Sequence, residues 1–196
     1  MKKAVFYSIA CFGILLLTAS FIIPGHNKKR TIKKTYTTAK IKKILSPLEE
    51  SPYYIVVDKS DYELKVYDDE GWYATYPIVF GSKDLGDKMK EGDRKTPNGS
   101  FKIILKKIHN KWGPELLLDY PNETSIQKFN DRKRKGIISK TAKIGAGIAI
   151  HATRPAEEWT IDNFYNWTDG CVSVKYTEMK DLFSYIPVGT VVTIQQ

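Results

Sequence analysis

Cysteine and histidine are scarce in this chain, which has two cysteines and three histidines among its 196 residues. The histidines are scattered, and only one cysteine lies beyond the apolar N-terminal run, so their spacing does not match that of a zinc site. The sequence also lacks a glycine-rich phosphate loop. The composition therefore predicts neither a bound metal nor another cofactor.

Acidic residues are few at the start of the chain, and this accounts for the formal net charge of +9. Residues 1–50 contain ten Lys or Arg and two Glu, whereas residues 51–196 contain 21 Lys or Arg and 20 Asp or Glu. A nucleic-acid-binding domain needs a basic face on the fold itself. The near-neutral charge of residues 51–196 argues against a nucleic-acid partner.

The longest uncharged run, Ala4 to Ile23, follows two lysines. A run of about 20 residues fits a transmembrane helix better than the apolar part of a secretory signal, although Thr18–Ser20 offers small residues for cleavage. We therefore expect a membrane anchor at 1–23, with a cleaved signal peptide as the alternative, and a basic linker at 24–50. The basic residues after the run favour a cytoplasmic domain by the positive-inside rule.

Short β-branched and aromatic segments alternate with turns in the rest of the chain. Strands are expected at Tyr53–Asp58, Tyr62–Tyr67, Trp72–Phe80, Ser100–Ile108, Glu115–Tyr120, Gly147–Ala152, Cys171–Val174 and Val188–Ile194. Helices are expected over 125–135 and 176–185. The pattern predicts one domain, 51–196, with a mainly β fold that is a sandwich or a curved mixed sheet with one or two small helices.

Cys171 is the one cysteine of this domain and follows Gly170 in the sequence NWTDGCVSV. In an oxidising compartment, a cysteine without an internal partner is either a hazard or the working group. Gly170 removes a side chain from the approach to the thiol, and the N–H groups of Gly170 and Cys171 are expected to be free to bind an oxyanion. Thr168 and Asp169 are expected to tighten this turn through hydrogen bonds to the backbone.

A thiol attacks a carbonyl carbon as thiolate, so Cys171 needs a nearby base. His151 ends the apolar segment GIAIHA and is separated from Cys171 by 19 residues. This spacing allows a strand, a loop and a returning strand, so the two side chains are expected to meet across neighbouring strands. A lone histidine at a strand end is more often structural, but its combination with the Gly-Cys turn indicates a Cys–His pair.

The intervening loop is rich in apolar and aromatic side chains. These side chains either form a lid over a binding groove or pack as a small satellite core. They are Trp159, Ile161, Phe164, Tyr165 and Trp167.

Two sequence blocks resemble the L,D-transpeptidase (YkuD-like) catalytic domain. In the first, fourteen residues separate His151-Ala152-Thr153 from Thr168-Asp169-Gly170-Cys171-Val172. In the second, Gly92-Asp93 leads into Thr96-Pro97-Asn98-Gly99 before a strand. The resemblance extends from Tyr53 to Ile194.

The resemblance implies a cysteine acyltransferase that acts on the peptide stems of peptidoglycan without a cofactor. Cys171 would attack the L-centre carbonyl of a tetrapeptide stem, with His151 as base, and an amine of a second stem would accept the acyl group. Gly170 and Cys171 would supply the oxyanion hole, and the main-chain carbonyl of Ala152 would orient His151. An L,D-carboxypeptidase, an amidase on wall-linked peptide and an inactive wall-binding domain of the same fold are the alternatives.

Two positions depart from the family pattern. Asp169 stands where His or Arg is common and is expected to disfavour an anionic partner, while Ser173 stands where Arg or Asn is common. Arg154, Ser173 and Trp167 are candidate substrate-binding residues, and Arg154 could hold a substrate carboxylate.

A wall substrate would place the domain in the cell envelope, anchored in the inner membrane and facing the periplasm or wall, or secreted after cleavage. This location conflicts with the positive-inside rule. The expected partners are peptidoglycan peptide stems, a wall-attached protein, and the membrane through the N-terminal segment.

Overall fold

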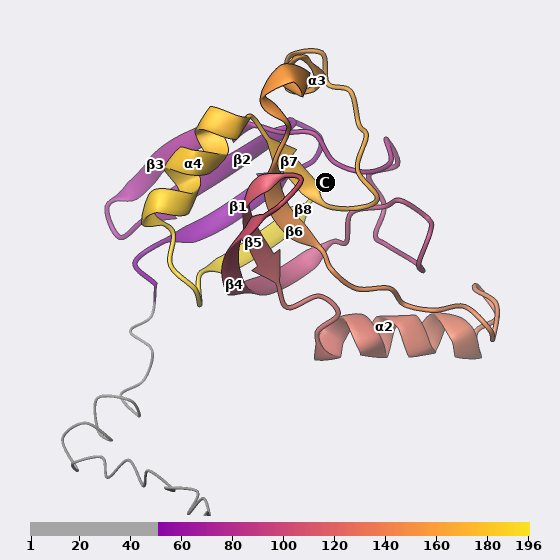
Figure 1. Ribbon diagram of the computed structural model, residues 1–196. Coiled ribbons are helices and arrows are strands. Elements are labelled where there is room, and N and C mark those ends of the chain that lie inside the picture. The colour runs from indigo at the N-terminus through magenta and orange to yellow at the C-terminus, as the bar shows by residue number, and fades with distance from the viewer. Residues whose placement is uncertain (1–50) are drawn as a thin grey trace, which may run out of the picture. The chain divides into compact units, whose positions relative to one another are not determined.

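The computed structural model describes residues 51–196 (Figure 1). The predicted anchor or signal peptide at 1–23 and the basic linker at 24–50 lie outside the described residues. Within residues 51–196, no helix has the length and apolar character needed to cross a bilayer. The strands are β1 (Tyr54–Asp58), β2 (Glu63–Asp68), β3 (Gly71–Pro77), β4 (Gly99–His109), β5 (Gly113–Leu118), β6 (Ala149–Ala152), β7 (Val172–Val174) and β8 (Val191–Gln195).

Three α-helices accompany these strands in the described part of the chain: α2 (Glu123–Arg134), α3 (Trp159–Asp162) and α4 (Tyr176–Tyr185). A 3-10 turn at Pro155–Glu157 precedes α3. The two predicted helices correspond to α2 and α4, whereas the single turn of α3 lies in the segment that was expected to be a loop. The mainly β fold class with small helices is confirmed.

The eight strands form one mixed sheet in the order β3-β2-β1-β8-β4-β5-β6-β7. The β1–β8 and β6–β7 pairs are parallel, and the other neighbours are antiparallel. Strand β4 joins the two halves, because Gly99–Lys102 pairs with β8 and Ile103–His109 pairs with β5. The register shifts between Ile103 and Leu105, and such an irregularity bends a strand and increases its twist. The sheet is therefore the curved mixed sheet expected from the sequence.

The core forms on one face of this sheet because apolar side chains recur at every second position in the strands. Ile55 and Val57 of β1 and Leu64 and Val66 of β2 are fully buried. Helix α4 covers the sheet (Figure 1) and contributes the buried side chains of Met179 and Leu182 to the same core. Burying one such side chain contributes about 1.5–3 kcal/mol.

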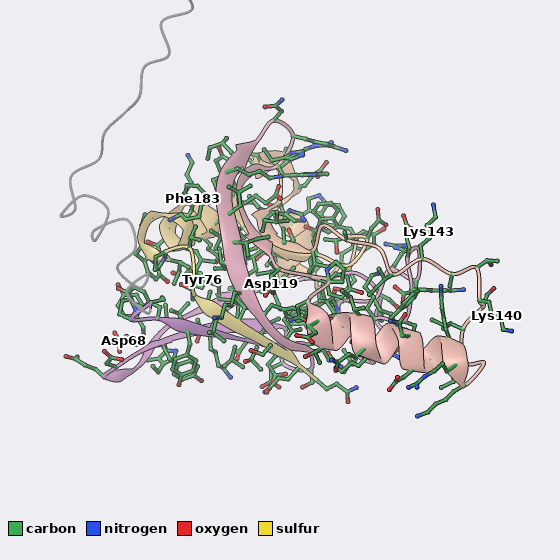
Figure 2. The ribbon with its side chains drawn as sticks, turned by 90° about the horizontal axis from the view of Figure 1, so that it is seen from below. Asp68, Tyr76, Asp119, Lys140, Lys143 and Phe183 are labelled. Carbon is green, nitrogen blue, oxygen red and sulfur yellow. The ribbon has the colours of Figure 1, made fainter. Side chains whose placement is uncertain are left out.

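Two polar contacts attach α4 to the strands below it. The Tyr76 hydroxyl of β3 lies 2.6 Å from a carboxylate oxygen of Asp181 and 2.8 Å from the Tyr185 hydroxyl. The Lys106 ammonium of β4 donates to the carbonyls of Phe183 and Ile186 at the end of the helix. These carbonyls have no partner within the helix, so the lysine stabilises its C-terminus. Figure 2 labels Phe183 of α4 and Tyr76 of β3 in the same part of the molecule.

The long segment 82–98 is fixed by buried charges. The Asp93 carboxylate accepts the backbone N–H groups of residues 89, 90 and 95 and pairs with Lys88 at 2.8 Å. The fully buried Lys59 donates to the carbonyls of residues 85 and 96. From α2, Arg132 donates to the Lys88 carbonyl at 2.7 Å and to Asp87 at 2.6 Å. Segment 82–98 is thus held by its own Asp93, by Lys59 and by Arg132 of α2.

Candidate active site

The predicted Cys–His pair lies on two neighbouring strands. In the parallel β6–β7 pair, Ile150 is opposite Val172 and His151 is opposite Ser173. Cys171 directly precedes β7, level with Ala149. Because side chains alternate between the faces of a sheet, His151 and Cys171 project from the same face, one diagonal step apart. The pairing of β6 with β7, which lie side by side at the edge of the sheet (Figure 1), therefore places the two residues on one face of neighbouring strands.

His151 is oriented by its own strand. Its Nδ1 lies 2.9 Å from the main-chain oxygen of Ala152, as expected for the predicted orienting carbonyl. A carbonyl oxygen only accepts hydrogen bonds, so Nδ1 carries the proton and Nε2 of the neutral ring does not. Burial lowers the pKa of His151, which keeps the ring neutral, although the Ala152 carbonyl and the nearby Glu115 charge oppose this shift.

Two tryptophans pack against the His151 ring. The ring centroids of Trp112 and Trp167 lie 5.7 Å and 5.6 Å from that of His151, and 4.9 Å from each other. His151 is 5% exposed. Trp112 comes from the turn between β4 and β5, where no sequence motif marks it as a site residue. The two indoles restrict the orientation of the imidazole and exclude water from one side of it.

The Cys171 thiol is protonated at rest. Burial raises the pKa of Cys171 to about 11, and the charges of Glu115 and Asp169 add to this effect, whereas the Ala149 N–H opposes it. The sulfur lies 3.5 Å from the Gly147 carbonyl oxygen, the distance at which a thiol donates a weak hydrogen bond. A neutral imidazole beside a neutral thiol suits general-base activation at the moment of attack and not a preformed ion pair.

The turn before Cys171 corrects two sequence predictions. The Thr168 hydroxyl donates to the Cys171 carbonyl at 2.7 Å and accepts the Gly170 N–H at 3.2 Å. The prediction that Thr168 tightens the turn is therefore confirmed. The same prediction for Asp169 is wrong, because its exposed side chain accepts no backbone hydrogen bond within residues 51–196. The prediction that the Gly170 N–H is free is wrong, because the Thr168 hydroxyl accepts it. Within residues 51–196, the Cys171 N–H makes no turn or loop hydrogen bond and remains the candidate oxyanion donor.

Gly170 is nevertheless required by the backbone. Its φ is +130°, and a Cβ at this position would lie 2.8 Å from the Lys95 carbonyl oxygen. The segment around Gly81 is equally close, since a Cβ on Gly81 would lie 2.9 Å from the Gly170 nitrogen. Glycine therefore allows segment 82–98 to pack directly against the turn that carries Cys171.

The candidate substrate-binding residues have different environments. Ser173 is fully buried and its hydroxyl has no hydrogen-bond partner in the described part of the chain, so the expected direct contact with substrate is wrong. Arg154 is exposed, but it pairs with Glu157 at 2.7 Å and its guanidinium lies 5.1 Å from the Trp112 ring centroid. Asp169 is 97% exposed and lies 3.6 Å from Arg94.

The loop that contains Trp167 has both buried and exposed side chains. Ile161 is buried, as a satellite core requires. Trp159, Phe164 and Tyr165 are about half exposed, and Trp159 and Tyr165 pack on each other with centroids 5.6 Å apart. Neither the lid nor the satellite core describes the whole loop.

A groove with a volume of about 460 Å³ lies beside the segment that contacts the thiol, and Cys171 itself is not among its lining residues. Two of its lining residues, Ala146 and Ile148, flank Gly147, whose carbonyl contacts the sulfur. Its charged lining residues are Lys88, Glu91, Arg94 and Asp169. Among residues 51–196, no three His, Cys, Asp or Glu side chains are arranged to hold a metal ion.

Comparison with known proteins identifies the family. The model of the YkuD family, the L,D-transpeptidase catalytic domain, matches residues 52–194. The structure is similar to that of the helical cell shape determining protein Pgp2 from Campylobacter jejuni, with 24% identity, a TM-score of 0.57, and coverage of 76% of this chain and 49% of that one. It is also similar to Bd1075 from Bdellovibrio bacteriovorus, with 26% identity, a TM-score of 0.51, and coverage of 74% and 47%.

This chain thus spans about half the length of those two solved chains. A comparison with curated protein sequences finds no match. The family model nevertheless covers the sheet from β1 to β8 except Gln195, the last residue of β8, together with the turn that carries Cys171. The chain therefore belongs to the YkuD family of L,D-transpeptidase catalytic domains.

Proposed function

We propose that this protein is an L,D-transpeptidase that joins peptide stems of peptidoglycan through a thioester on Cys171, with His151 as the base. The observation that carries the proposal is the arrangement of the two side chains. The Ala152 carbonyl fixes the proton on Nδ1 of His151 and leaves Nε2 as an acceptor, on the same face of the sheet as the thiol. Membership of the L,D-transpeptidase family supports the choice of substrate.

In the first half of the reaction, the Cys171 thiol gives its proton to Nε2 of His151 as the sulfur attacks the L-centre carbonyl of a tetrapeptide stem. The Cys171 N–H is positioned to donate to the developing oxyanion. The tetrahedral intermediate then breaks the bond to the terminal D-amino acid, and His151 returns the proton to the leaving amine. The products are a thioester and a free amino acid.

In the second half, an amine of another stem attacks the thioester carbonyl. The amine gives up a proton to His151, a C–N bond forms, and the C–S bond breaks. The proton on His151 then returns to the sulfur. With water in place of the amine, the same steps release a shortened stem, which is the carboxypeptidase alternative.

This function requires the domain to reach the wall. We therefore assign it to the cell envelope, with residues 1–23 anchoring the chain in the inner membrane or removed as a signal peptide, and with residues 51–196 on the periplasmic or wall side. The peptide stems are the proposed partners. A wall-attached protein with a suitable amine is a second acceptor of the same chemical type.

The first experiment tests whether Cys171 is acylated. The purified chain is incubated with a carbapenem, and the adduct is located by peptide mass mapping, which separates Cys171 from Cys11. We expect an adduct at Cys171 whose formation is lost in His151→Gln. The matched control is His109→Gln, which removes the other histidine of the domain and should leave acylation within about twofold of the wild type.

The second experiment identifies the bond that is made. Muropeptides from cells that carry Cys171→Ala are compared with those from wild-type cells. We expect direct stem-to-stem cross-links to decrease in the variant. A change in trimmed stems alone would assign the carboxypeptidase reaction instead, and an unreactive Cys171 with unchanged muropeptides would contradict both enzymes and favour the inactive wall-binding domain.

A further inference from the structure

Arg94 and Asp169 form an ion pair that remains open at the groove beside the thiol. Nε of Arg94 lies 3.6 Å from Oδ1 of Asp169, beyond the range of a good hydrogen bond. The side chains of Arg94 and Asp169 are 52% and 97% exposed. Both groups therefore keep hydrogen-bonding capacity for a bound molecule.

Three other ion pairs of segment 82–98 are closed by short contacts. Lys88 lies 2.8 Å from Asp93, Lys95 lies 2.6 Å from Asp84, and Asp87 lies 2.6 Å from Arg132 of α2. These pairs hold the segment in place. The Arg94–Asp169 pair differs from them because its two charged groups are not in short contact with each other, and because both residues line the groove.

The backbone of Arg94 is fixed even though its side chain is accessible. Its φ is +58°, a left-handed conformation that non-glycine residues adopt infrequently. Its carbonyl accepts the Ser82 N–H at 2.7 Å, and its guanidinium reaches the Thr168 carbonyl at 3.4 Å and 3.5 Å. Arg94 is therefore positioned against the turn that carries Cys171, and part of its planar donor fork is still unused.

The position of this pair relates it to the reacting bond. Asp169 is two residues before Cys171, and the groove that both residues line extends along Gly145–Ile148, whose Gly147 carbonyl contacts the sulfur. A cation and an anion side by side complement a ligand that carries both charges on adjacent groups. An arginine fork suits a carboxylate, and a carboxylate suits an ammonium.

We propose that Arg94 and Asp169 bind the charged head of an α-amino acid, with the α-carboxylate on Arg94 and the α-ammonium on Asp169. This inference rests on the proposed acyl transfer at Cys171. It assigns the ligand chemistry to the amino acid that leaves when the thioester forms and to the one that enters when the thioester is resolved. The leaving and the entering amino acid occupy the same place. The first half of the reaction breaks a C–N bond and forms a C–S bond, and the second half does the reverse.

The proton balance is consistent with this site. An incoming ammonium on Asp169 loses one proton to the solvent and becomes a nucleophilic amine. As its nitrogen attacks the thioester, a second proton passes to His151 and then to the sulfur that leaves. The products are one amide and one thiol. Asp169 thus selects and holds the ammonium form, and His151 performs the proton transfer.

The inference is tested by amino-acid exchange with purified full-length protein. The donor is a tetrapeptide stem, the acceptors are D-methionine and D-methioninamide, and the products are quantified by mass spectrometry. In Arg94→Gln we expect the KM for D-methionine to rise about tenfold, with the KM for D-methioninamide within about twofold of the wild type, because the amide has no carboxylate. Arg94→Lys should restore part of the difference.

Asp169→Asn should raise the KM for both acceptors, since both carry the ammonium. The effect on kcat is followed separately, because the Asp169 charge also raises the pKa of Cys171. The matched control is the exposed pair Arg134 and Asp131 on α2. Arg134→Gln and Asp131→Asn should change neither KM. The rate of Cys171 alkylation by iodoacetamide confirms that the thiol site of the Arg94 variants and of the control variants is intact, and the midpoint of urea unfolding does so for Asp169→Asn, where the alkylation rate itself changes with the pKa of Cys171.

The outcomes distinguish the two proposals. If wild-type protein exchanges D-methionine but Arg94→Gln affects both acceptors equally, the assignment of Arg94 to the carboxylate is wrong, while acyl transfer stands. If the wild type forms no exchange product and no acyl adduct at Cys171, the proposed function fails and this inference fails with it.

Discussion

The protonation state of the resting thiol provides a direct test of how this site is activated. Burial raises the pKa of Cys171 to about 11 from the ordinary value of 9.0 and lowers the pKa of His151. Both shifts favour the neutral forms. A thiolate–imidazolium pair would require the two opposite shifts, so the folded protein should contain almost no thiolate at neutral pH.

The raised pKa of Cys171 sets the expected decrease in its alkylation rate. At pH 7 a thiol with a pKa of about 11 is ionised in roughly one molecule in ten thousand, against roughly one in a hundred at the ordinary value. Iodoacetamide reacts with the thiolate. We therefore expect folded Cys171 to be alkylated about 100-fold more slowly than the same residue in urea-unfolded protein, where burial is lost.

The assay follows the Cys171 peptide by mass spectrometry between pH 6 and 10. The expected rate in the folded protein rises about tenfold per pH unit across this range, since the titration midpoint lies above it. Unfolded protein should approach a plateau near its lower pKa. A plateau of the folded-state rate below pH 8 would refute the reasoning, because it would reveal an ion pair with His151.

Four further substitutions test individual contacts. Gly170→Ala should lower the free energy of unfolding by about 1–3 kcal/mol in urea titrations, because of the positive φ and the adjacent carbonyl. Ser173→Ala should change it by less than about 1 kcal/mol in the same assay, since the buried hydroxyl has no partner. Glu115→Gln should lower the pKa of His151 further in an NMR titration, because the Glu115 charge raises it. Burial lowers the pKa of Lys59 to about 8 from 10.5, so urea titrations should show the wild type gaining stability over Lys59→Met as pH rises from 8 to 10.5, by roughly 3 kcal/mol at most.

The strands and the Cys–His pair could be predicted because their signals are local. Alternating apolar residues indicated β1 and β2, and their pairing and burial agree with that pattern. The spacing of His151 and Cys171 indicated neighbouring strands, and the structure pairs β6 with β7. The end points were less predictable. The third strand ends at Pro77 and not at Phe80, because residues 78–81 leave β3, and Val79 pairs with Ser173 instead.

Other features depend on contacts between distant segments. Trp112 lies in a tight turn with no sequence signal, yet β5 pairs with β6 and brings that turn to His151. The Gly170 N–H was expected to bind an oxyanion because it directly precedes Cys171. The structure shows that the Thr168 hydroxyl accepts it, which the sequence does not reveal. Lys59 follows the expected strand Tyr53–Asp58 and has no local signal for burial, yet the structure buries it under segment 82–98.

The charge count of the sequence also leaves out contacts between distant segments. Near-neutrality of residues 51–196 argued against a nucleic-acid partner, but a sum treats every ion pair alike. In the structure, Lys88 and Asp93 satisfy each other in the interior, whereas Arg94 and Asp169 stand apart beside the groove. A closed pair contributes to the position of the loop, whereas an open pair keeps its charges available to a bound molecule. Only the folded chain separates these two uses of charge, and the exchange assay measures the second of them directly.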